Sequence, residues 1–181
     1  QMDSVIGNKS GKVLLTMFFQ NSNLLLAFLR DHNTARSVLD VFNDLYAMFG
    51  RETYCRLFPV ILTDRGSEFS NPVPIEQDEN DELRSLVFYC NPSAPYQKGG
   101  IEVAHELVRR VLPKGKSFDD LQQEDIDLML SHINSYKRGK LNSRSAYQLF
   151  NFIYGDDILP KLNIREIEAN DIVLSPKLLK K

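Results

Sequence analysis

The spacing of hydrophobic residues over the first thirty positions is typical of β-strands. Short apolar runs at 2–6, 12–19 and 24–29 are separated by the turn-rich segments 7–11 and 20–23. Apolar runs of this length, bounded by Gly, Asn and Ser, usually form strands that are joined as hairpins. The pattern therefore predicts three consecutive antiparallel strands.

The hydrophobic residues that follow are spaced for a helix. Its apolar positions are Val38, Val41, Phe42, Leu45, Tyr46 and Phe49. Asn33 or Thr34 is a suitable N-cap, and Gly50 is expected to end the helix.

Two more strands are predicted at 58–62 and 86–90. A strand that follows a long helix is most simply parallel to an earlier strand, because the helix acts as the crossover.

The second half of the chain has mainly helical spacing. Three amphipathic helices are predicted, at about 101–111, 126–139 and 145–152. The segment 70–82, which holds two prolines and several acids, is expected to be a surface loop. A further strand is expected at 170–174, and residues 178–181 are expected to fray.

This order of elements predicts an α/β fold with a mixed sheet: three antiparallel strands, then two parallel strands, flanked by helices. The first strand is expected in the middle of the sheet, with the strand at 58–62 as its parallel neighbour. The 181 residues, 43% hydrophobic and 25% charged, are enough for one domain. We assign residues 1–155 to this domain and 156–181 to a C-terminal extension.

Composition and charge narrow the function classes. No apolar stretch is long enough for a membrane span and no segment resembles a secretory signal, so a cytoplasmic protein without a membrane partner is expected. Cys55 and Cys90 do not have the spacing of metal ligands.

The net charge of −2 is unlike that of a protein that binds DNA through a broadly basic surface. Basic residues nevertheless cluster at 109–116 and 137–144, which permits a local phosphate track. Because a strand begins directly after Gln1, we expect an excised domain.

Three carboxylates are placed to meet at one end of the predicted sheet. Asp64 follows the strand at 58–62, and ligands of open α/β sheets bind outside the carboxyl ends of strands. Glu102 falls in the first turn of a predicted helix, directly after Gly99 and Gly100. Asp3, in the first strand, can face the same region. An Asp at a strand end and a Glu in a first turn form half of a metal site.

Each carboxylate also has a simpler explanation. Asp64 precedes a glycine turn, where Asp is common, and Glu102 would interact favourably with the helix dipole. Glu106 lies one helical turn beyond Glu102, so spacing alone does not exclude it as the ligand. Glu68 is expected to bond locally and steady the turn after Asp64.

Four motifs occur in a fixed order: DSVIG at 3–7, TDRGSEF at 63–69, PYQKGGIE at 95–102 and LPKG at 112–115. Together they resemble the catalytic core of bacterial insertion-sequence transposases, most of all the insertion-sequence-thirty class, from about residue 3 to about residue 152. These transposases are similar to retroviral integrases and to ribonuclease H. The resemblance implies a ribonuclease-H-like fold with a catalytic triad of Asp3, Asp64 and Glu102.

The resemblance also implies an activity. The chain would be a DDE-type polynucleotidyl transferase that cuts DNA phosphodiester bonds and joins strands during transposition, with water or a 3′-hydroxyl as nucleophile. Asp3, Asp64 and Glu102 would bind two Mg²⁺ or Mn²⁺ ions about 3.5 to 4 Å apart, which activate the attacking oxygen and stabilise the leaving oxygen. The implied partners are transposon-end and target DNA and further copies of the chain, at the bacterial nucleoid.

The expected phosphate contacts are Arg65, Lys98, Arg109, Arg110 and Lys114. The chain departs from the family pattern at several positions. Arg65 stands where Asn is common, and Ile101 and Val103 flank the Glu where asparagines are usual. His105 replaces another polar residue and is expected on the helix surface. A catalytically inactive DNA- or protein-binding module of the same fold and a purely hydrolytic nuclease therefore stay open as alternatives.

Overall fold

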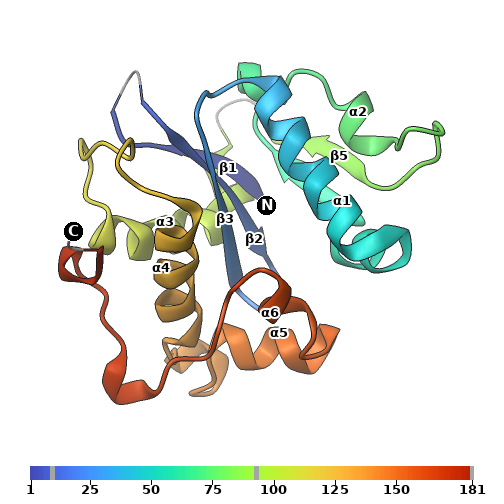
Figure 1. The fold of residues 1–181 in the computed structure, drawn as a ribbon. Coiled ribbons are helices and arrows are strands. Elements are labelled where there is room, and N and C mark those ends of the chain that lie inside the picture. Colours follow the sequence, from blue (N-terminus) through green and yellow to red (C-terminus); the bar gives the residue numbers. More distant parts are fainter. Residues whose placement is uncertain (9–10, 92–93, 180–181) are drawn as a thin grey trace.

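The computed structural model describes residues 1–8, 11–91 and 94–179 and begins with the three predicted antiparallel strands. They are β1 (Met2–Ile6), β2 (Val13–Phe19) and β3 (Leu24–Arg30), in the order β1-β2-β3. Every residue of the central strand β2 is buried. The reason is visible in Figure 1: α3 (Gly99–Val111) and α4 (Gln123–Ser135) cover one side of this sheet, and α1 (Ala35–Leu57) lies on the other.

Helix α1 begins where the sequence predicts, and a second helical segment follows the predicted end at Gly50. The Thr34 hydroxyl accepts a hydrogen bond from the Ser37 backbone N–H, and the Ser37 side chain bonds back to Thr34, which forms a capping box. Gly50 takes the positive φ of 72° that glycine tolerates and interrupts the helical path, so the first helical segment ends there, as predicted. A second helical segment then continues α1 to Leu57.

The fourth and fifth strands form a separate parallel pair. They are β4 (Val60–Thr63) and β5 (Leu86–Tyr89), with Val60 opposite Leu86. The predicted set of three antiparallel and two parallel strands is confirmed. Within the described part of the chain, however, β1 and β4 share no backbone ladder, although the Thr63 hydroxyl donates to the Met2 carbonyl (3.3 Å). The expected direct pairing of β1 with β4 is therefore not formed.

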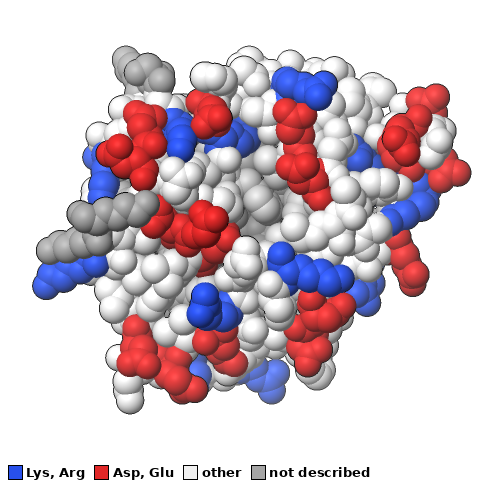
Figure 2. All heavy atoms as spheres, in the orientation of Figure 1, with Lys and Arg blue, Asp and Glu red and all other residues white. Residues whose placement is uncertain are grey.

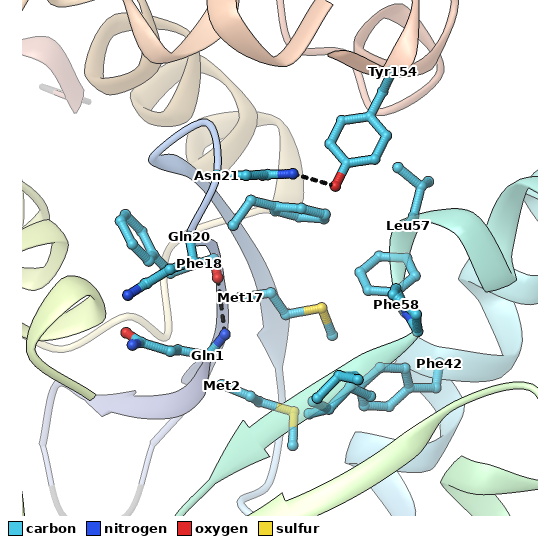
Figure 3. Close-up of a pocket in the computed structure, with 14 residues that line it drawn as sticks. Gln1, Met2, Met17, Phe18, Gln20, Asn21, Phe42, Leu57, Phe58 and Tyr154 are labelled. Carbon is cyan, nitrogen blue, oxygen red and sulfur yellow. Dashed lines mark hydrogen bonds between the residues drawn. The ribbon is translucent and has the colours of Figure 1, made fainter. Parts of the chain in front are cut away.

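A cavity of about 270 Å³ opens at the junction of the two sheets. Figure 3 shows Met2 and Met17 from the first sheet and Phe42 and Phe58 from the α1 side around it. Met2 also accepts the hydrogen bond from Thr63, the residue before Asp64, so the cavity adjoins this hydrogen bond between β1 and the end of β4.

The remaining helices are α2 (Val73–Glu76), α5 (Ala146–Tyr154) and α6 (Ile158–Lys161). The segment 70–82, expected to be a loop, thus contains the short helix α2. The strand expected at 170–174 is wrong, because a 3-10 turn, Ala169–Asp171, begins there and no strand follows it in the described residues. Leu178 and Leu179 form part of another 3-10 turn, and Leu179 is buried. Residues 180 and 181 lie outside the described part.

Side chains cover the outer edges of both sheets. On β3, the Asn134 amide of α4 accepts from the Leu25 N–H (2.9 Å) and donates to the Leu25 carbonyl (2.8 Å). Gln123, also on α4, accepts from the Leu29 N–H (2.8 Å) and donates to the Ala27 carbonyl. On β5, Glu76 Oε1 accepts from the Val87 N–H (2.8 Å). These edge groups are thereby satisfied without another strand.

The segment after residue 155 packs onto α4. Ser131 and Ser135 accept backbone hydrogen bonds from Arg165 and Ile167. The apolar residues that the segment adds to the core are Ile158, Leu159, Leu162, Ile164 and Leu179. Residues 156–179 thus share one core with the rest of the chain, and the domain boundary near 155 stays a prediction.

His132 makes this docking sensitive to pH. Its Nδ1 accepts a hydrogen bond from the Val173 N–H (3.1 Å), which requires a neutral ring. Burial lowers the pKa of His132 below its usual 6.5. The unfolded chain therefore binds a proton at a higher pH than the folded chain does, so His132 stabilises the fold above about pH 6.5, and this contribution is lost as the pH falls through the folded pKa.

We expect the free energy of unfolding, measured with urea, to fall between about pH 7 and pH 5. In His132→Asn the fall should be less steep, because asparagine keeps an acceptor oxygen but does not titrate. Equal slopes in the two proteins would contradict a role for His132.

Candidate active site

Asp64 lies directly after β4, and two donors fix its carboxylate. The Gly66 backbone N–H donates to Oδ1 (2.9 Å), and the Lys98 ammonium donates to Oδ2 (2.8 Å). Partial burial alone would raise the pKa of Asp64, but the hydrogen bonds from Lys98 and Gly66 outweigh it and hold the pKa below its usual value. Asp64 is therefore ionised.

Asp3, on β1, is held in the same way. The Ser4 backbone N–H donates to its Oδ1 (2.8 Å), and its Oδ2 lies 3.1 Å from Lys98 Nζ. Lys98 thus bridges the two carboxylates. Burial alone would lower the pKa of Lys98, but its bonds to Asp64 and Asp3 raise the pKa overall, so the ammonium keeps its charge.

Glu102 does not join this cluster. Within residues 1–8, 11–91 and 94–179, no group of three or more His, Cys, Asp or Glu side chains is close enough to hold a metal ion. Glu102 is exposed in the first turn of α3, and Glu106 is exposed one turn later. The structure therefore brings Asp3 and Asp64 together around Lys98 and leaves both glutamates at the surface.

The first turn of α3 is nevertheless anchored beside β1 and β2. The Ile101 N–H donates to Gln1 Oε1 (2.8 Å), which satisfies one free donor of the helix start. A Cβ atom at Gly100 would lie 2.6 Å from the Phe18 ring, so only glycine allows this close approach. The turn that carries Glu102 is thus fixed against the strand that carries Asp3.

A buried link that sequence reasoning missed also joins α3 to β1. The Thr16 hydroxyl donates to the Asp3 carbonyl (2.9 Å) and lies 2.8 Å from His105 Nε2. Because the hydroxyl has one proton, Nε2 must carry a hydrogen and donate to Thr16. Burial lowers the pKa of His105, which keeps the ring neutral. His105 is therefore half-buried and not a surface histidine; the available signal was Thr16, a polar residue in an apolar strand.

Glu68 steadies the turn after Asp64, as expected. Its Oε1 accepts from Asn33 Nδ2 (3.0 Å), and Asn33 Oδ1 accepts from the Arg30 guanidinium (2.8 Å). Burial lowers the pKa of Arg30 to about 10, so Arg30 is still a cation at neutral pH. This network connects the turn to the segment before α1.

The residues expected to contact phosphates differ in whether they are exposed or already bonded within the chain. Arg109 donates to the Ile6 carbonyl (2.9 Å), and so it anchors α3 to the end of β1. Arg65 is exposed beside Asp64, with its guanidinium 5.9 Å from the centre of the Tyr89 ring.

Arg110, at the end of α3, and Lys114, just beyond it, are exposed. Figure 2 shows one face of the molecule, on which acidic and basic side chains are interspersed. On that face the basic residues do not form one broad patch. This agrees with the net charge of −2, which is unlike that of a protein with a broadly basic surface. The described part of the chain contains no helix that is both long and apolar enough to cross a membrane.

Comparisons with curated proteins point to DNA recombination enzymes, although no family model matches the chain. It is 29% identical over 150 residues to a putative integrase, ORF3, of a Spiroplasma virus, which covers 83% of this chain and 44% of the relative. It is 22% identical over 147 residues to the transposase InsI for insertion sequence element IS30A of Escherichia coli (81% and 36%). A 63-residue stretch is 35% identical to the transposase for IS1086 of Cupriavidus metallidurans (35% and 19%). The chain spans less than half the length of these relatives.

Solved structures share the fold. The catalytic core domain of BIV integrase matches with a TM-score of 0.53 and 21% identity, over 84% of this chain and 90% of that one. A chain of the simian T-cell lymphotropic virus intasome, solved with the PP2A regulatory subunit B56 gamma, matches with a TM-score of 0.58 and 16% identity (93% and 56%). The expected resemblance is therefore confirmed: this chain is similar in sequence to insertion-sequence transposases and integrases, and it has the ribonuclease-H-like fold of integrase catalytic cores.

Proposed function

We propose that this chain is the catalytic core of a transposase or integrase that cuts DNA phosphodiester bonds and transfers strands with the help of divalent metal ions. The observation that carries the proposal is the convergence of two carboxyl groups, Asp3 and Asp64, on one cation. They come from β1 and from the end of β4, where ligands of α/β sheets bind.

The two carboxylates are oriented alike. The Ser4 backbone N–H donates to Oδ1 of Asp3, and the Gly66 backbone N–H donates to Oδ1 of Asp64. In each, Oδ2 points to the shared cation. Because backbone donors hold these side chains, the Oδ2 atoms are preorganised to bind positive charge.

The donor set fits Mg²⁺ or Mn²⁺, since both prefer hard oxygen ligands. Asp3 and Asp64 would hold the ions, and Glu102, free at the start of α3, would complete the set. When bound, two such ions activate the attacking oxygen and stabilise the leaving oxygen at the phosphorus. The link from His105 through Thr16 to the Asp3 backbone keeps α3 and β1 together while this occurs.

DNA is the proposed substrate, both as transposon ends and as target. Arg65, Arg110 and Lys114 are exposed and would contact the phosphates. Because each neutralised phosphate releases counterions, binding through them would weaken as salt rises. We further propose that the chain acts as a homo-oligomer on DNA in the bacterial cytoplasm, at the nucleoid.

A specific observation favours a second candidate, a DNA- or protein-binding module without catalytic activity. Glu102 lies apart from Asp3 and Asp64, and Lys98 neutralises part of their charge. Arg65 adds another positive charge beside Asp64. In this alternative the carboxylates would have only a structural role.

Product analysis separates these functions. The chain would be incubated with labelled duplex DNA that carries a free 3′-hydroxyl, with Mn²⁺ or with EDTA, and the products resolved on denaturing gels. A transposase or integrase core yields both cut and joined strands, a nuclease only cut strands, and a binding module a mobility shift without either. Cleavage that persists in EDTA would contradict the metal-dependent mechanism.

A further inference from the structure

The cation between the two carboxylates is part of the chain itself. Lys98 Nζ lies 2.8 Å from Asp64 Oδ2 and 3.1 Å from Asp3 Oδ2. The Lys98 side chain is only 8% exposed, although lysine is rarely buried unless it is paired. A metal ion shared by these carboxylates would bind the same two Oδ2 atoms, because these converge on one point while each Oδ1 accepts a backbone N–H.

We propose that Lys98 is a resident counter-ion of the site: it holds Asp3 and Asp64 together in the absence of metal, leaves when the first metal ion binds, and then takes a DNA phosphate as its new partner. The inference rests on the proposed function and adds a form of regulation to it. Metal binding and DNA binding become coupled through one side chain.

Lys98 and a metal ion cannot share the site. A divalent ion binds carboxylate oxygens at about 2.0 to 2.2 Å, which would place it within a few ångströms of the ammonium. Two cations at that distance in a partly buried site repel each other strongly. Binding of metal between the Oδ2 atoms therefore requires Lys98 to move away.

Lys98 can leave without a change in the backbone around it. It ends a single 3-10 turn, Pro95–Lys98, and α3 starts at the next residue. This turn is fixed from outside, because Gln1 Nε2 donates to the Gln97 carbonyl and the Asn91 N–H donates to Gln97 Oε1. Only the flexible four-carbon side chain has to rotate, and its ammonium suits a phosphate oxygen.

The displaced ammonium needs an acceptor, and DNA supplies one. Without DNA, metal must compete with Lys98, so metal affinity is low. With DNA present, the phosphate stabilises the displaced Lys98, and metal affinity rises. By linkage, metal must increase DNA affinity by the same factor. The site would thus load metal mainly when DNA is bound.

The test is Mn²⁺ binding to the chain, followed by water-proton relaxation, for wild type, Lys98→Gln, Lys98→Arg and Lys177→Gln. We expect Lys98→Gln to bind Mn²⁺ at least about tenfold more tightly than wild type in the absence of DNA. Lys98→Arg keeps the charge and should stay near wild type, as should the control Lys177→Gln at an exposed lysine with no proposed role in binding. A short duplex should raise the affinity of wild type and change that of Lys98→Gln much less.

The outcomes separate the inference from the proposed function. If wild type and Lys98→Gln bind Mn²⁺ with equal affinity, the proposed role of Lys98 is overturned. If Asp64→Asn weakens Mn²⁺ binding in both, the metal site itself is still supported. No Mn²⁺ binding in any variant, with or without DNA, would overturn both. Thermal unfolding of each variant shows whether it is folded. If Lys98→Gln does not fold, Lys98→Met in the presence of Mn²⁺ gives the same comparison: metal should raise its melting temperature more than that of wild type, and an equal or smaller rise would overturn the inference.

Discussion

DNA cleavage by Asp64→Asn is expected to be about a thousandfold slower than cleavage by the wild type, because about 4 kcal/mol of metal-dependent stabilisation is lost from the transition state. Asparagine has nearly the same size as aspartate, and its Oδ1 can still accept from the Gly66 N–H. The fold should therefore be kept while the negative charge at Oδ2 is removed. Initial cleavage rates with Mn²⁺ measure the effect, and thermal unfolding checks the fold.

Two glutamates on α3 provide the matched comparison. Glu102→Gln should lose activity to a similar extent, because Glu102 is the proposed third ligand. Glu106→Gln should keep wild-type activity, although Glu106 is equally exposed on the same helix. The reverse result, with loss in Glu106→Gln alone, would assign the third ligand to Glu106.

The largest expected loss of stability comes from Asn134→Ala. Asn134 is fully buried, and its amide pairs with both the N–H and the carbonyl of Leu25. Each buried backbone group left without a partner costs about 1 to 3 kcal/mol, so the loss of both partners should lower the free energy of unfolding by about 2 to 6 kcal/mol. Urea denaturation at pH 7 measures the change.

Leu128→Ala is the control for this substitution. Leu128 lies on the exposed face of the same helix, α4, so its replacement should change the free energy of unfolding by about 0.5 kcal/mol at most. If Asn134→Ala were as mild as Leu128→Ala, the amide would not be what satisfies the edge of β3.

Local patterns were sufficient to predict most of the secondary structure. The apolar runs located the five strands of the described residues, and Thr34, one of two predicted N-caps, marks the start of α1. The break at Gly50 was also predicted, but not the second helical segment that follows it up to Leu57. The strand prediction failed at 170–174. There the chain forms a 3-10 turn and then bonds to His132 of α4 through the Val173 N–H, so the apolar residues do not belong to a strand.

The candidate site was predictable only in part, because its contacts join distant positions. The motifs indicated Asp3, Asp64 and Glu102, and the structure brings the first two together. Nothing in the sequence shows that Lys98 lies between them, since 34 positions separate Lys98 from Asp64. The roles of these residues in catalysis stay predictions that the substitutions above can test.

The side-chain cover on the outer strands has a consequence for assembly. Asn134 and Gln123 occupy the hydrogen-bonding groups of β3, and Glu76 occupies an N–H of β5. An incoming strand would have to displace these side chains before it could pair, so neither sheet can readily be extended by another copy or by a bound peptide. We therefore expect the proposed oligomer to be built from helix and loop surfaces. The β-strand content measured by circular dichroism should be the same in the monomer and in the assembled protein.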